Sequence, residues 1–206
     1  MIKMWQAEIE EITSDVEDLL YSKYQAEELE RIIKANNFVM LSVGSFWEHF
    51  KLNYTYFVIS KIWHQVDEDN RSLSLINLLK DLLEHHDSIT KSWWVSRNPT
   101  ALSPREFEEN FGKEEYLDPD VVREDIKKLK ETTKEIIEFR HKRVGHKDKG
   151  GKFSSHIGGQ EINKAVRSIE TLVKKYQLLL TQSGYESLTP MPDDWQKAFT
   201  KAWIQS

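Results

Sequence analysis

Apolar residues recur at every third or fourth position over most of the chain, which is the spacing of one face of an α-helix. A longer segment rich in aromatic residues covers positions 38–66, and the turn sequence DEDNRS follows it at 67–72. Ser72 is then predicted to be the N-cap of a helix within LSLINLLKDLLEHH. Before these segments, the stripe of an N-terminal helix is formed by Trp5, Ile9, Ile12, Val16 and Leu19.

The second half of the chain predicts three further helices and a short tail. SPREFEENF at 103–111 favours a short helix with Pro104 in its first position. Asp118-Pro119 opens a long helix from about residue 120 to 144, which Gly145 ends. In the tail, Trp195 and Trp203 are expected to pack back on the body. The last long helix carries the stripe Ile162, Val166, Ile169, Val173, Tyr176 and Leu180.

The fold class follows from these helices and from the lack of any convincing alternating strand pattern. We expect an all-α antiparallel helix bundle with additional N- and C-terminal helices, forming one domain over residues 1–206. With 39% hydrophobic residues and seven tryptophans, the chain can bury a sizeable core. The segment MIKMWQAEIEEI lacks an apolar signal core, and charged residues interrupt the apolar stretch 38–63. The expected location is therefore the cytoplasm, with no membrane segment.

The distribution of charge along the chain is uneven at one segment, residues 140–152. The protein carries a net charge of −5, yet residues 140–152 contain six Lys or Arg against one Asp, a net +5. A polyanion should be drawn to this stretch, although a solvated basic loop is the ordinary interpretation of such a run. The following loop, residues 145–159, holds five of the eight glycines.

Arg140 falls on the predicted packing face of the 120–144 helix. It lies eighteen residues after Val122, about five helical turns, so both side chains should point the same way. A guanidinium on that face needs a partner, a ligand or a subunit interface. A structural ion pair is one alternative. The neighbouring Lys142 and Arg143 are explained by the negative end of the helix dipole.

His146 would point about 240° away from Arg140 if the helix continued as an α-helix. A left-handed Gly145 could turn the chain and bring His146 back. Alternatively, two copies meeting along the Arg140 face would supply two Arg and two His to one cleft, which predicts a symmetric homodimer.

Arginine and histidine in a basic cleft suit RNA cleavage by the 2′-hydroxyl. A histidine can take the hydroxyl proton or protonate the leaving 5′-oxygen, and an arginine can hold the phosphorane oxygens with a planar fork. No metal or cofactor is required. The absence of cysteine excludes a thiol nucleophile and a thiolate zinc site.

The residues Arg140, His141 and His146 resemble the signature of the HEPN superfamily, an Arg, a polar residue and a more distant His. The flanking sequences EFRHKRVGHKDK and NRSLSLINLLKDL are most similar to the AbiU-like branch, which is associated with abortive infection. The resemblance implies a dimeric helical bundle, and in many members a metal-independent endoribonuclease of toxin–antitoxin or phage-defence systems.

The same resemblance assigns roles to the residues. Arg140 and His146 would be catalytic, and His141 would be the supporting polar residue. Some toxin members carry a modifiable Tyr two positions after the His, where this chain has Asp148. That departure puts this mode of neutralisation by a cognate antitoxin in doubt. Substrate RNA would contact Lys142, Arg143 and Lys147.

Two other functions stay open. A non-catalytic HEPN bundle would bind a protein partner or a nucleotide, and would use Arg140 in an intramolecular ion pair. A helical scaffold would be monomeric, with a basic edge that is only a helix terminus. Outside the motif, roles in packing or at the surface are expected for His49, His64, His85, His86, Trp93, Trp94 and His156.

Overall fold

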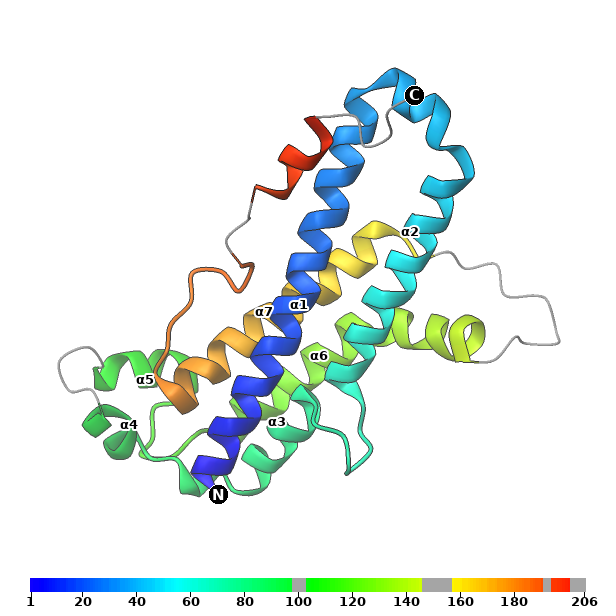
Figure 1. Ribbon diagram of the computed structural model, residues 1–206. Helices are drawn as coiled ribbons and strands as arrows, with labels where there is room; N and C mark the ends of the chain where they lie inside the picture. The colour runs from blue at the N-terminus through cyan, green and yellow to red at the C-terminus, as the bar shows by residue number, and fades with distance from the viewer. Residues whose placement is uncertain (98–102, 146–156, 191–193, 201–206) are drawn as a thin grey trace.

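The computed structural model describes residues 1–97, 103–145, 157–190 and 194–200, with the backbone alone for 37–43 and 143–145. Within these ranges the protein is all-α, as the sequence predicts, and it forms a helix bundle (Figure 1). One isolated bridge pairs Thr90 with Tyr116. The α-helices are α1 (Ile2–Ala35), α2 (Asn37–Val66), α3 (Leu75–Glu84), α4 (Lys91–Arg97), α5 (Pro104–Phe111), α6 (Pro119–Phe139) and α7 (Gly159–Thr181). Shorter helical turns are the 3₁₀ segments His86–Ser88 and Trp195–Thr200 and the π-helical segment Arg140–Gly145.

The two longest helices, α1 and α2, form an antiparallel hairpin whose far end projects beyond the other helices (Figure 1). The kink in α2 lies at Gly44, where φ is 25°. Such a positive φ is accessible to glycine at little cost, because glycine has no Cβ. Along α2, large apolar side chains remain exposed, including Phe46, Leu52 and Phe57.

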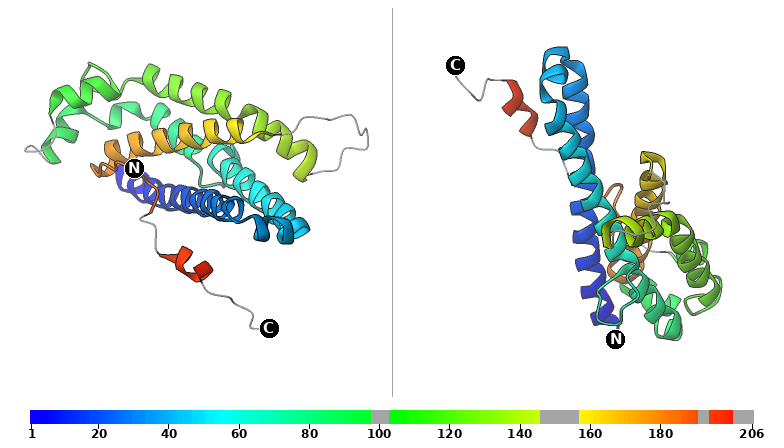
Figure 2. Two further views of the ribbon diagram at one scale, coloured as in Figure 1. Left: turned by 90° about the horizontal axis from the view of Figure 1, so that it is seen from above. Right: turned by 90° about the vertical axis from the view of Figure 1, so that its right-hand side faces the viewer.

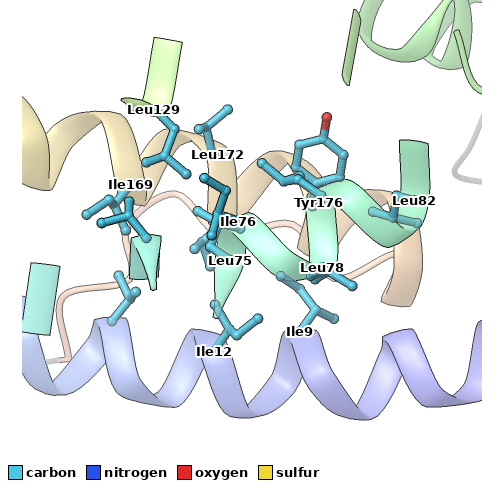
Figure 3. Close-up of a cluster of buried hydrophobic side chains, with 14 of the residues drawn as sticks. Ile9, Ile12, Leu75, Ile76, Leu78, Leu82, Leu129, Ile169, Leu172 and Tyr176 are labelled. Atoms are coloured by element: carbon cyan, nitrogen blue, oxygen red, sulfur yellow. The ribbon is translucent and has the colours of Figure 1, made fainter. Parts of the chain in front are cut away.

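Helix α7 lies between α1 and α6 and packs against both (Figure 2). The apolar stripes expected from the sequence face one another here, because burying them together removes the most apolar surface from water. Ile162 is only partly buried, whereas the other aliphatic members of the α1 and α7 stripes are buried. Figure 3 shows this core, with contributions from α1 (Ile9, Ile12), α3 (Leu75, Ile76, Leu78, Leu82), α6 (Leu129) and α7 (Ile169, Leu172, Tyr176).

Side-chain caps set where several helices begin. Ser103 forms a capping box with Glu106, and Pro104 occupies the first turn of α5, as expected. Asp118 caps α6 by accepting a hydrogen bond from the Asp120 backbone N–H. The prediction for α3 was wrong by two residues: Ser74 is the N-cap, and its hydroxyl accepts from the Asn77 backbone N–H. Ser72 instead donates to Asp67 at 2.7 Å within the preceding turn.

A polar cluster ties α6 to α7 at the edge of this core. The Asp125 carboxylate accepts hydrogen bonds from the Tyr176 hydroxyl at 2.9 Å and from Lys175 at 2.6 Å. Tyr176 is fully buried, so its hydroxyl has lost its contact with water. Burial, with the nearby Asp125 charge, raises the pKa of Tyr176 well above its ordinary value. The tyrosine therefore remains a neutral donor.

Replacing Asp125 by alanine is expected to lower the free energy of unfolding by about 2–3 kcal/mol, because a buried hydroxyl and an ammonium lose their acceptor. Urea unfolding of both proteins measures this difference. Asp120→Ala is the matched control, since Asp120 is an exposed acid on the same helix. Equal losses in the two variants would contradict the role assigned to Asp125.

No helix in the described ranges is both long enough and apolar enough to span a membrane. This agrees with the interruption of the apolar stretch 38–63 by charged side chains.

Candidate functional site

The Arg140–His146 motif lies where α6 changes its geometry. The α-helix ends at Phe139, and residues 140–145 continue as a π-helical turn. A π-turn has i→i+5 hydrogen bonds and is wider than an α-helix, and such turns frequently occur at functional sites. The α-helical angle of about 240° between Arg140 and His146 therefore does not apply to this chain. His146 and Lys147 lie outside the described residues, and for Arg143 only the backbone is described.

Trp63 of α2 contacts both described residues of the motif. The Arg140 guanidinium carbon lies 4.1 Å from the Trp63 ring centroid, which is a cation–π contact. The His141 ring meets the same indole edge-on, at 5.2 Å between centroids and 83° between planes. Trp63 itself is partly buried against the core, so it is a firm support. The tryptophan therefore orients Arg140 and His141 together.

The partner of Arg140 is thus an aromatic ring of its own chain. Among the described residues, no carboxylate lies within ion-pair distance of its guanidinium. The intramolecular ion pair expected of a non-catalytic bundle does not form between these residues. The hydrogen-bonding edge of the guanidinium therefore has no carboxylate partner in this part of the chain.

The side of Trp63 that carries Arg140 borders a pocket of about 590 Å³, which we call the acidic pocket. Asp15 is paired there with Lys61 and accepts a hydrogen bond from Gln65 at 2.8 Å. The buried Gln65 Oε1 has no hydrogen-bond partner. His64, expected in the core or at its rim, has a 57% exposed side chain and so lies at the rim. The carboxylates lining the pocket are Glu11, Asp15, Asp18 and Asp67.

The side of Trp63 that carries His141 borders a second hollow of about 510 Å³, which we call the apolar groove. Glu68 lies on its rim and is bound by Lys80 at 2.5 Å and by Lys130 at 2.8 Å. These two lysines hold the pKa of the Glu68 carboxyl below its usual value. The lining consists of Trp63, Val66, Glu68, Ile76, Lys130, Glu131, Thr133, Lys134, Ile137, Glu138 and His141.

The remaining candidates lie elsewhere. One group of potential metal ligands occurs in the described ranges, at the end of α3. Its possible ligand atoms, from Asp81, Glu84 and His85, lie within 4.8 Å of one another. Asp81 already accepts a hydrogen bond from Trp5. Trp94 is buried, Trp93 is partly buried, and His156 lies outside the described residues.

Trp63 is the site residue that the sequence did not single out. It stands in an aromatic-rich segment, where its spacing is typical of packing residues. Only the crossing of α2 with the end of α6 brings it to Arg140. The only feature of the sequence that could have pointed to Trp63 is its position next to His64 in SKIWHQV, and this indication is weak.

The helical bundle and the motif at the end of α6 define a HEPN-type protein. Residues 7–204 match the family model described as AbiU2, so the chain belongs to the AbiU2 family, a HEPN family associated with abortive infection. No curated protein and no solved structure matches the chain significantly.

Proposed function

We propose that this protein is a metal-independent endoribonuclease that cleaves RNA by attack of the 2′-hydroxyl, as a toxin or phage-defence component. The observation that carries the proposal is Arg140: its guanidinium carbon lies 4.1 Å from the Trp63 ring centroid, and the group has no carboxylate partner among the described residues. A cation fixed in advance stabilises developing phosphorane charge without a reorganisation cost. Membership in the AbiU2 family supports the same assignment.

In the proposed reaction, the substrate 2′-oxygen attacks the adjacent phosphorus and the 5′-oxygen leaves. His146 either takes the 2′-hydroxyl proton or donates a proton to the leaving 5′-oxygen. Arg140 binds the non-bridging oxygens, and His141 supports the motif through its contact with Trp63. The products are a 2′,3′-cyclic phosphate and a 5′-hydroxyl. Lys142, Arg143 and Lys147 would contact neighbouring phosphates, so RNA affinity should fall steeply with salt.

We further propose that the enzyme acts as a cytoplasmic homodimer that joins two motifs in one cleft. A cognate antitoxin would then act by covering this cleft, since Asp148 stands where a modifiable tyrosine would be needed. Light scattering tests the dimer, because a monomer would give a mass near 24.4 kDa.

One observation favours a second function, a non-catalytic bundle that binds a protein partner. The acidic pocket beside Arg140 is lined by four carboxylates, and among the described residues Lys61 pairs with two of them while His64 lies 4.0 Å from Asp15. Such a pocket attracts a basic surface and repels a polyanion.

The deciding experiment is cleavage of a mixed RNA pool by the purified protein at low salt in EDTA. We expect products with 2′,3′-cyclic phosphate ends, and no cleavage of oligonucleotides that carry a 2′-deoxy residue at the cleaved position. The Arg140→Ala/His146→Ala variant, purified in parallel, controls for contaminating nucleases. Equal cleavage by this variant, or no cleavage by a folded dimer, would favour the binding function.

A further inference from the structure

The apolar groove lies beside the motif and is built from three helices. Its floor consists of Val66 from α2, Ile76 from α3 and Ile137 from α6. Val66 and Ile76 are buried, so the floor is anchored in the core, while Ile137 is partly buried. Trp63 and His141 form the wall nearest to Arg140. The groove is therefore a preformed apolar hollow whose wall includes a residue of the motif.

The groove suits a flat aromatic ligand. Its volume of about 510 Å³ falls within the range of roughly 300–1,000 Å³ typical of small-molecule sites. The exposed His141 ring stands nearly perpendicular to Trp63, at 83°, so the two rings form a corner. A planar group entering this corner can stack on one ring and meet the edge of the other. Nucleobases bind in this way, and because every base has a π-face, such binding tolerates any sequence.

Charge distinguishes this groove from the acidic pocket, with which it shares Trp63. On the groove rim, Lys130 and Lys134 oppose Glu131 and Glu138, and Glu68 is paired with Lys80 and Lys130. The rim is therefore close to neutral and admits an uncharged base. The acidic pocket repels phosphate, so the groove, which shares Trp63 with that pocket, is the less unfavourable place for an RNA strand beside Arg140.

We propose that the apolar groove binds one unstacked nucleobase of a single-stranded RNA substrate, held against Trp63 and His141 next to the phosphate that Arg140 contacts. This inference rests on the proposed nuclease function and specifies its substrate class. A base within a duplex stays stacked on its neighbours and is not free to enter, so duplex RNA should be a poor substrate.

The test is the binding of uncleavable 2′-O-methyl oligonucleotides to the wild-type protein and to Ile137→Phe, which fills the groove floor. Ile126→Phe is the matched control, since Ile126 is also a partly buried isoleucine of α6 and does not line the groove. We expect Ile137→Phe to weaken binding about tenfold, and Ile126→Phe to leave it within about twofold. A second measurement uses oligonucleotides that each lack the base at one position. For the wild-type protein, only one of these positions should show a loss of affinity comparable to that of Ile137→Phe.

The outcomes separate the groove from the nuclease. Suppose that the wild type cleaves RNA, that Ile137→Phe binds with unchanged affinity, and that no abasic position weakens binding. These results would contradict base binding in the groove and would leave the proposed nuclease function intact. Binding with the expected losses but no cleavage would support the groove and overturn catalysis. Failure to bind any oligonucleotide would overturn both. If Ile137→Phe changed only the light-scattering mass, the groove would be a contact between copies of the chain. Should Ile137→Phe not fold by circular dichroism, the abasic scan alone decides.

Discussion

Replacing Arg140 by alanine is expected to slow RNA cleavage by about 10²–10³-fold, the typical cost of removing one charge-stabilising donor from an active site. Its guanidinium is held on Trp63 and would stabilise the phosphorane, in which negative charge is greatest. Loss of such an interaction should appear mainly in kcat, with a smaller change in KM. Single-turnover cleavage of a defined RNA measures it directly. A comparable loss is expected for His146→Ala.

Two further variants test whether the loss of cleavage is specific to the Arg140 guanidinium. Arg140→Lys keeps the charge but loses the planar fork and most of the stacking, so it should recover only part of the rate. Arg123→Ala removes an exposed arginine from the same helix and should cleave like the wild type. Because a partly exposed cation–π contact contributes only about 0.5–1 kcal/mol, Arg140→Ala should remain folded. Wild-type cleavage by folded Arg140→Ala would rule out its proposed role.

The largest loss of stability among the variants considered is expected for Trp94→Ala, about 3–5 kcal/mol. Trp94 is fully buried and packs against Phe107 at 5.8 Å and Phe111 at 6.0 Å between ring centroids. Its indole N–H donates to the Leu178 carbonyl oxygen of α7 at 3.4 Å. Removing the ring would leave a large cavity and detach α4 and α5 from the end of α7. Chemical denaturation followed by circular dichroism measures the free energy of unfolding.

The adjacent Trp93 supplies a matched comparison. It is partly buried, and the Arg97 guanidinium carbon lies 5.1 Å from its ring centroid. Trp93→Ala should therefore cost much less than Trp94→Ala, about 1 kcal/mol. The packing role expected from the sequence is confirmed for Trp94, which is fully buried. Similar losses for the two variants would show that burial does not distinguish them.

For the candidate site, the sequence supplied the motif but not its surroundings. Arg140 was predicted on the packing face of its helix, and its side chain does pack against α2. The catalytic roles of Arg140, His141 and His146, and the RNA contacts of Lys142, Arg143 and Lys147, stay predictions. The contact with Trp63 and the acidic pocket could not be predicted, because their residues come from α1, α2 and the turn after α2, all distant from Arg140 in the chain.

The sequence by itself determined most of the long helices and which side of them is buried. Helical periodicity and capping are local: apolar residues at three- and four-residue spacing mark a face, and Ser103 and Asp118 cap helices through atoms a few residues away. Only the tertiary structure decided which ring supports Arg140, which carboxylate satisfies Tyr176, and which hollows flank the motif. These contacts join helices distant in sequence. They depend on the angles and positions at which the helices cross and on the π-turn after Phe139. A periodic sequence pattern specifies neither of these features.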